Sequence, residues 1–266
     1  MGERVLSYQL SEKDQIADAH RIRLGALQVI DRAYGSGYPK WTVGRHDLPY
    51  HNGHHGRAVG NMAVKLCTAY GLPRVEQAIA NVAGFAHDIV QLKGRGIDED
   101  ESADWLDKAL QEKHSFPAHL REMAILAILG TQPKFRNGRL IGQAADDLFY
   151  PTKNAELVAK SVASADFGEL HTPQGPYLGH QLFREIHKIA PNSTLPRQAI
   201  IGFQQNQIEL GESYTYPLVK AEHLLATHRP EVIAHHQDVL EKLEKGTLES
   251  WAELIDYDLA FMYNNS

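Results

Sequence analysis

The sequence predicts an all-α fold, and three observations support that prediction. Apolar residues recur every three to four positions along most of the chain, which is the spacing of amphipathic helices. Glycine and proline fall between these periodic segments, where helices end, and the alternating pattern of surface strands is essentially absent. The chain has 266 residues, of which 43% are hydrophobic and 23% charged, as expected of a globular protein with a sizeable core.

The first three predicted helices follow from local start and stop signals. Ser11 suits the N-cap of a helix over residues 12–33, whose apolar side chains form a broad stripe. A second helix over residues 53–70 is closed by Gly71. Pro73 suits the first turn of a third helix, which continues through the apolar run AIANVAGFAHDIV.

The later helices follow the same logic. The segment QLKGRGIDEDES separates the third helix from a fourth, whose first turn is rich in Asp and Glu, as the helix dipole favours. Pro117 opens a fifth helix, and Pro133 ends it. Further helices are predicted at 154–166, 177–189, 197–210, 218–244 and 248–263. Because no repeat, linker or low-complexity tract marks a boundary, we predict that residues 1–266 form one all-helical domain with a C-terminal helical extension.

Composition excludes several classes of protein. Lys and Arg total 27 against 33 for Asp and Glu, a net charge of −6, so nothing favours binding to a nucleic-acid backbone. The single cysteine, Cys67, fits a reducing compartment. No signal-peptide core and no run of 18 apolar residues occurs. We therefore expect a cytoplasmic protein without a membrane partner; the sequence does not indicate its oligomeric state.

Four residues from three segments form a candidate metal-binding set: His55, His87, Asp88 and Asp166. His87 and Asp88 are the most informative, because they end an apolar helix in which ionisable groups are costly to bury without compensation. A cation would compensate them, although an internal His–Asp hydrogen bond or a helix end that reaches water is the alternative. Asp166 becomes a candidate only because the set follows the order His, His-Asp, Asp along the chain. Most of the 15 histidines, including His235 and His236, are expected at the surface or in packing.

His51 is a candidate catalytic residue. It precedes His55 by four positions, so the two share a face if both are helical. An imidazolium titrates near neutral pH and can donate a proton to a leaving oxygen. The alternative is a histidine-rich helix start that only caps and contacts solvent. His54, by its position, would point elsewhere.

The segments PYHNGHHGRAV, FAHDIVQ and ASADFGEL resemble the motifs of the HD superfamily of metal-dependent phosphohydrolases, with a core at about residues 50–170. The resemblance implies an HD-type helical bundle in which His55, His87, Asp88 and Asp166 bind a divalent ion. Such a ligand set suits Mn²⁺, Fe²⁺, Co²⁺, Ni²⁺ or Zn²⁺, and suits Mg²⁺ less well. The opening Tyr-His-Asn also resembles that of cyclic-nucleotide phosphodiesterases, which implies that His51 is the general acid.

Departures from the family patterns narrow these expectations. Two-metal members carry another histidine shortly after the His-Asp pair, where this chain has Val90, Gln91 and Lys93, so we expect one metal. The acidic pair of guanosine-tetraphosphate hydrolases is also missing. Among the acidic residues 98–101 we select Glu101 as the group that orients water, although a solvated helix N-terminus explains them equally well.

The expected substrate is a small-molecule phosphate ester, either a nucleotide or a related compound. Arg57, Lys93 and Arg95 are candidates for contacts with phosphate. Two alternatives stay open: an iron-dependent oxygenase on the HD scaffold, and a non-catalytic metal-binding signalling or scaffold domain. In the C-terminal hundred residues, the segment HTPQGPYLGHQLFREI could cover the site or form a subunit contact. Aromatic residues there are predicted to be core residues: Tyr214, Tyr216, Trp251, Tyr257, Phe261 and Tyr263.

Overall fold

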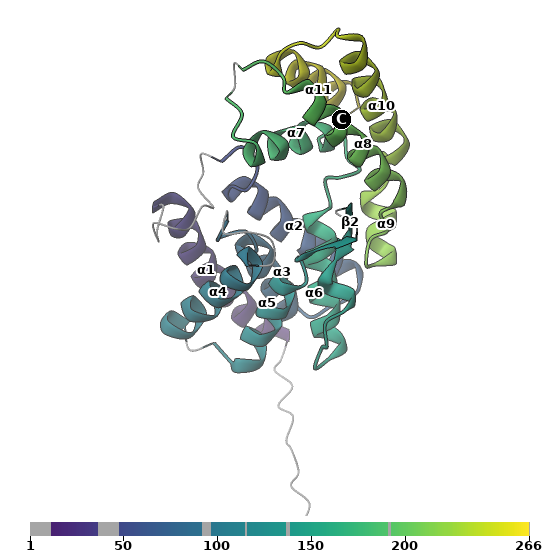
Figure 1. Ribbon diagram of the computed structural model, residues 1–266. Coiled ribbons are helices and arrows are strands. Elements are labelled where there is room, and N and C mark those ends of the chain that lie inside the picture. Colours follow the sequence, from purple (N-terminus) through teal and green to yellow (C-terminus); the bar gives the residue numbers. More distant parts are fainter. Residues whose placement is uncertain are drawn as a thin grey trace, which may run out of the picture.

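The computed structural model describes residues 12–36, 48–91, 97–114, 116–136, 139–190 and 193–265. It confirms the all-α prediction, because helices make up most of these residues and the strands among them form one two-stranded sheet. Figure 1 shows two groups of helices, with α1 to α6 below and most of the C-terminal helices above. That residues 1–266 form a single domain stays a prediction.

The first group of helices surrounds α3 and holds the larger hydrophobic core. Its members are α1 (Glu12–Ser36), α2 (Gly53–Ala69), α3 (Arg74–Ala86), α4 (Asp98–His114), α5 (Ala118–Leu129) and α6 (Lys153–Asp166). From Gln77 to its last residue, α3 is buried on every side. This explains why its sequence is almost uniformly small and apolar, since a helix with neighbours all round has no polar face.

Glycines allow α2 and α3 to approach closely. A Cβ atom built on Gly60 would lie 2.5 Å from the carbonyl oxygen of Asn81, and one on Gly84 would lie 2.8 Å from the Cα atom of Gly60. A Cβ on Gly56 would lie 2.6 Å from the carbonyl oxygen of Phe85. No larger residue fits these crossings without movement of the backbone. The contact brings the start of α2 beside the end of α3.

A short β-hairpin follows α5 and departs from the prediction of an essentially strand-free chain. Strands β1 (Pro133–Arg136) and β2 (Arg139–Gln143) pair antiparallel, with a register shift between Lys134 and Phe135. The sequence signal was the dipeptide Asn-Gly between them, which favours a tight hairpin turn. A short 3₁₀ helix, η1 (Ala144–Asp146), connects β2 toward α6.

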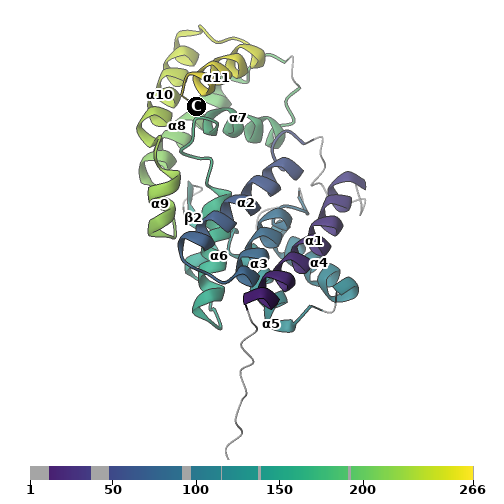
Figure 2. The same cartoon turned by 180° about the vertical axis from the view of Figure 1, so that it is seen from behind.

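The second group of helices has its own hydrophobic cluster, centred on Phe183, Ile200 and Trp251. It contains α7 (Gly175–Ile186), α8 (Arg197–Ser213), α10 (Arg229–Lys245) and α11 (Trp251–Asn265). Helix α9 (Val219–Leu225) instead packs against the first group, where Ala221 and Leu225 join the larger core. The view from behind in Figure 2 shows α9 beside α6 and below α8 and α10.

The single helix predicted over residues 218–244 is wrong, because the chain breaks between α9 and α10 at Ala226–His228. Pro230 occupies the first turn of α10. Its ring has no N–H to donate to the preceding turn and clashes with the carbonyl four residues earlier, so a continuous helix cannot pass through it. Among the predicted core aromatics, Trp251 is buried, whereas Tyr263 is 74% exposed. None of the helices in the described ranges is long and apolar enough to cross a bilayer.

Candidate metal centre

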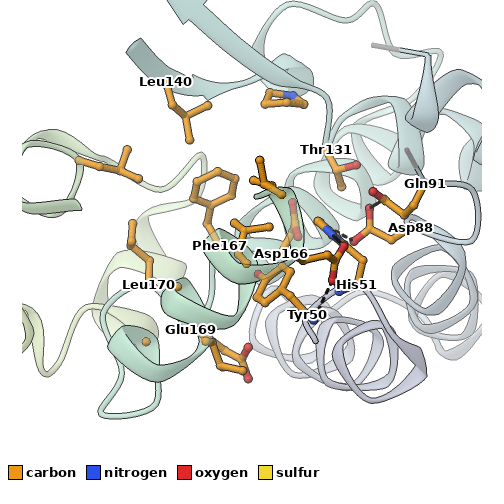
Figure 3. A pocket seen from close by; sticks show the side chains of 18 of the residues that line it. Tyr50, His51, Asp88, Gln91, Thr131, Leu140, Asp166, Phe167, Glu169 and Leu170 are labelled. Carbon is orange, nitrogen blue, oxygen red and sulfur yellow. Dashed lines mark hydrogen bonds and ion pairs between the residues drawn. The ribbon is translucent and has the colours of Figure 1, made fainter. Parts of the chain in front are cut away.

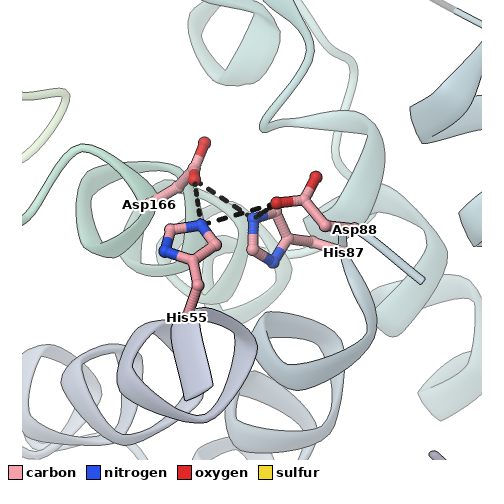
Figure 4. Close-up of side chains that lie close together, drawn as sticks. All are labelled: His55, His87, Asp88 and Asp166. Atoms are coloured by element: carbon pink, nitrogen blue, oxygen red, sulfur yellow. Dashed lines mark hydrogen bonds and ion pairs between the residues drawn. The ribbon is translucent and has the colours of Figure 1, made fainter. Parts of the chain in front are cut away.

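Three segments that are distant in sequence meet where α2 begins and where α3 and α6 end. His55 lies in the first turn of α2, which Asn52 caps by accepting hydrogen bonds from the N–H groups of His54 and His55 at 2.9 and 3.2 Å. His87 and Asp88 follow α3 directly, and Asp166 is the last residue of α6. Figure 4 shows the four side chains converging. The neighbouring His54 is exposed, as its position predicted.

Each of the four side chains presents one atom toward a common point. Nε2 of His87 lies 2.8 Å from Oδ2 of Asp88 and 3.1 Å from Oδ1 of Asp166. Nε2 of His55 lies 3.4 Å from each of the same two oxygens. Ligands at right angles around an ion with bonds of roughly 2.1 Å are about 3 Å apart. The buried cluster of His55, His87, Asp88 and Asp166 could therefore hold a metal ion.

Hydrogen bonds to the outer atoms fix the orientation of the ligands. Nδ1 of His87 donates to the carbonyl of Gly84 at 2.8 Å, which leaves Nε2 facing the centre. Gln91 donates to Oδ1 of Asp88 at 2.6 Å, and Gln143 donates to Oδ2 of Asp166 at 2.8 Å. Each carboxylate thus uses one oxygen for an amide and turns the other inward. Such outer partners are typical of metal sites.

Unpaired buried atoms show that the cluster is incomplete as a hydrogen-bonded unit. Both ring nitrogens of His55 and Oδ2 of Asp88 are buried and have no hydrogen-bond partner among the described residues. Buried polar atoms are rarely left unpaired, since each costs roughly 1–3 kcal/mol. A cation between Nε2 of His55 and Oδ2 of Asp88 would satisfy two of the three atoms. The residues present therefore fit a metal ion.

The charges in the cluster are balanced in pairs. Burial lowers the pKa of His55, but the carboxylates of Asp166 and Asp88 outweigh it and raise that pKa to about 9. Burial opposes charge on His87 too, and the same carboxylates raise its pKa well above the usual value. For Asp88 and Asp166, burial raises the pKa, but the imidazoles hold it below the usual range. A metal ion that binds both Nε2 atoms must displace protons from them.

His51 lies beside the cluster and is held by a carboxylate from the second group of helices. Its Nδ1 is 2.7 Å from Oε1 of Glu185, on α7. Oε2 of Glu185 accepts hydrogen bonds from the backbone N–H groups of Tyr50 and His51, at 2.9 and 3.0 Å. Nε2 of His51 is then left 3.9 Å from Oδ2 of Asp88. His51 is thus next to the four candidate ligands, with its free nitrogen toward them.

A cavity of about 490 Å³ opens beside the cluster, between the two groups of helices. His51, Asp88 and Asp166 line one part of it (Figure 3). Such a volume is within the range of small-molecule sites. The segment expected either to cover the site or to form a subunit contact, residues 171–186, supplies part of the opposite wall through α7.

The structure brings Glu99, and not the selected Glu101, to this cavity. Residues two positions apart on a helix point in nearly opposite directions, so only one of Glu99 and Glu101 can face the cavity. Burial, and then the charges of nearby carboxylates, raise the pKa of Glu99 to about 7. Its Oε2 is buried without a hydrogen-bond partner among the described residues.

The candidate phosphate contacts are not assembled around the cavity in the described ranges. Arg57 pairs with Asp31 and lies 5.2 Å over the ring of Phe85, away from the cavity lining. Lys93 and Arg95 lie outside the described residues.

The sequence interpretation missed the residues that position others. Gln143 and Glu185 come from segments without a recognised motif, and their partners are 23 and 134 positions away in sequence. Gln91 was noted only as a departure from family patterns; its place three residues after Asp88 was the available signal.

No protein-family model matches the sequence, and none of the curated proteins compared with it matches either. Membership of the HD superfamily therefore stays a prediction from the sequence motifs.

Proposed function

We propose that this chain is a metal-dependent phosphohydrolase of the HD type, which cleaves a phosphate ester of a nucleotide or a related small molecule. The observation that carries the proposal is the convergence of His55, His87, Asp88 and Asp166, with the free nitrogen of His51 beside them and a small-molecule cavity in front. These two imidazoles and two carboxylates would hold a divalent ion and would leave room beside it for water and substrate.

A divalent ion held by these residues would supply Lewis acidity, which would acidify a water molecule and offset charge on a phosphoryl oxygen. The hydrolysis forms a P–O bond to the water oxygen and breaks the P–O bond to the leaving group. His51 donates its Nε2 proton to the departing alkoxide, which leaves as an alcohol. Throughout, Nδ1–H of His51 is donated to Glu185, so the ring keeps its orientation.

Glu99 takes the role that the sequence interpretation gave to Glu101. Its carboxyl lines the cavity and is raised in pKa to about 7. A carboxyl with such a pKa can accept a proton near neutral pH. We propose that Glu99 receives the proton that the attacking water loses.

The test joins elemental analysis to a phosphate-release screen over nucleoside monophosphates, cyclic nucleotides and dinucleotides. The wild type should bind about one equivalent of metal and release phosphate or a phosphomonoester. The double variant His87→Ala/Asp88→Ala should lose both metal and turnover. His51→Ala should keep the metal and lose kcat by about 10²–10⁴-fold. His54→Ala is the matched control, because its exposed ring is adjacent in sequence.

Three outcomes would contradict parts of the proposal. Loss of metal in His51→Ala would place that residue among the ligands. Oxygen uptake by an iron-loaded protein would favour the oxygenase. Metal binding without turnover across a broad panel of phosphate esters would favour a signalling or scaffold domain.

A further inference from the structure

The cavity beside the metal centre has two chemically different ends. Figure 3 shows His51, Asp88 and Gln91 on one side and Leu140, Phe167 and Leu170 on the other. The polar side is the one on which the proposed chemistry takes place. The apolar side extends away from it and is built from β2, the segment after α6, and α7.

One face of α7 forms much of the apolar end. Gly175, Leu178, Gly179 and Leu182 recur at helical spacing and all line the cavity. Phe183, on the flank next to this face, is buried in the core of the second group. Leu178 and Leu182 stay partly exposed on the cavity side, and grouped exposed apolar side chains commonly mark a ligand surface.

The charges of the described residues that line the cavity argue against a polyanionic substrate. Among the described residues that line it there is no Lys or Arg, and six are acidic: Asp88, Asp98, Glu99, Asp166, Glu169 and Glu185. A metal ion can offset the charge of one phosphoryl group, but additional phosphates would face these carboxylates. Glu185 lies three residues after Leu182 on α7, but both of its oxygens already accept hydrogen bonds from Tyr50 and His51.

Resting on the proposed function, we propose that the preferred substrate is a phosphate monoester whose leaving group is apolar and uncharged, an alkyl or aryl alcohol. The phosphoryl group lies at the polar end of the cavity, beside His51 and Asp88, and the organic group lies against Leu140, Phe167 and the leucines of α7. Hydrolysis converts ROPO₃²⁻ and water into ROH and HPO₄²⁻, with the alcohol oxygen protonated by His51. The cavity volume of about 490 Å³ leaves room for such a group beyond the phosphoryl end.

Two measurements test this substrate class. The first is kcat/KM with Mn²⁺ for ethyl, butyl, hexyl and octyl phosphate, beside AMP and phosphocholine. Each methylene that enters the apolar end should raise kcat/KM about fourfold, until the cavity is filled. The second is calorimetric binding of octylphosphonate and methylphosphonate, which are not hydrolysed. Octylphosphonate should bind more tightly by a similar factor per methylene.

Matched variants locate the effect. Leu182→Asn should weaken binding of octylphosphonate about tenfold and leave methylphosphonate within about twofold. Leu224→Asn is the control, because Leu224 is 51% exposed on α9 and does not line the cavity. Melting temperatures confirm that both variants fold.

The two proposals fail in different ways. If no ester is hydrolysed but octylphosphonate still binds in a manner that depends on Leu182, the phosphohydrolase proposal fails and the apolar site stands. If esters are hydrolysed but kcat/KM does not rise with chain length, the substrate class is overturned. A preference for AMP or phosphocholine would overturn it too. Equal binding of the two phosphonates would overturn it as well.

Discussion

Two buried clusters of His and Asp occur in the described residues, and they differ in how completely they are hydrogen-bonded. The first is the candidate metal centre. The second joins α7, α8, α10 and α11 through His180, Gln204, His235, His236 and Asp258, and is called the C-terminal histidine network below. All five residues are 0–6% exposed.

Every hydrogen bond in the C-terminal histidine network has a donor and an acceptor. His236 donates from Nδ1 to Oε1 of Gln204 at 2.7 Å, and the amide of Gln204 donates to Nε2 of His180. Nδ1 of His180 donates to Asp258, and so does Nε2 of His235, at 2.9 Å. These hydrogen bonds give both oxygens of the Asp258 carboxylate a partner, so no cation is needed.

The comparison shows that residue type alone does not define a metal site. In the metal centre, His55 and Asp88 have unpaired inward atoms and a second carboxylate is present. In the C-terminal histidine network, each residue is hydrogen-bonded to a neighbour, and none of its described atoms is buried without a partner. The sequence interpretation placed His235 and His236 at the surface or in packing, and their burial assigns them to packing.

The largest effect should come from breaking the C-terminal histidine network. Asp258→Asn puts an amide N–H against a ring N–H and removes the only carboxylate of the network, so the free energy of unfolding should fall by about 3–5 kcal/mol. Urea titration measures it, and Asp256→Asn on the exposed side of α11 is the control. Metal content should be unchanged. If folded Asp258→Asn protein lost its metal, the separation of the two clusters would be wrong.

At the metal centre, unlike at the C-terminal histidine network, the free energy of unfolding should depend on added metal. With free metal at 100 times its dissociation constant, the wild type should be more stable than chelator-treated protein by about 2.7 kcal/mol. Asp166→Asn should abolish this difference, whereas Asp258→Asn should retain it. Thermal scans with and without EDTA provide the measurement. A metal-dependent shift that persists in Asp166→Asn would remove that residue from the ligands.

Much of the metal centre could be predicted from particular residues in the sequence. The apolar α3 ending in His87 and Asp88 was recognisable, because ionisable groups are conspicuous on such a helix. The helix boundaries also followed closely from caps such as Gly71. The four candidate ligands lie within the quoted motifs, so the order of those motifs was enough to select them as candidates.

The rest depended on long-range contacts that no local pattern records. Glu185 reaches His51 only because α7 packs above the start of α2, and Gln143 reaches Asp166 only because the hairpin folds back. The choice between Glu99 and Glu101 required the rotation of α4 about its axis, which an uninterrupted acidic run does not reveal. Pro230 was a local signal that the prediction passed over.

A change in the distance between α2 and α3 should disturb the metal centre more than the C-terminal histidine network. Gly60→Ala inserts a methyl group 2.5 Å from a carbonyl oxygen, and overpacking of this kind costs roughly 1–3 kcal/mol. The shift should also weaken metal binding. Gly202→Ala on α8 is the control, because nothing lies within 4 Å of its added Cβ; it should stabilise by about 0.5–1 kcal/mol. Equal metal affinity in wild type and Gly60→Ala would show that the ligands tolerate the shift.

The smallest expected effect is a pH dependence from the C-terminal histidine network. Burial, and then the neighbouring His180 and His235, lower the pKa of His236 to about 3, against about 6.5 in an unfolded chain. The unfolded state therefore takes up the proton first. The contribution of neutral His236 is complete above about pH 6.5 and is lost as pH falls toward 3, at up to about 1.4 kcal/mol per pH unit.

Urea unfolding of wild type and His236→Gln at pH 7, 6 and 5 isolates this term, since the other titrating groups are shared. The stability difference between the two proteins should shrink as the solution becomes more acidic. A difference that stays constant would show that His236 is not buried as a neutral ring.

In the proposed reaction, the contact between Glu185 and His51 makes proton delivery depend on the packing of α7 against the start of α2. A fragment that ends after α6 would keep all four candidate metal-binding side chains but not the carboxylate that aligns the proposed acid. The proposal thus assigns ion capture and turnover to different stretches of polypeptide. Any event that loosens the upper helices from the lower ones should then silence the proposed reaction while leaving the ion in place.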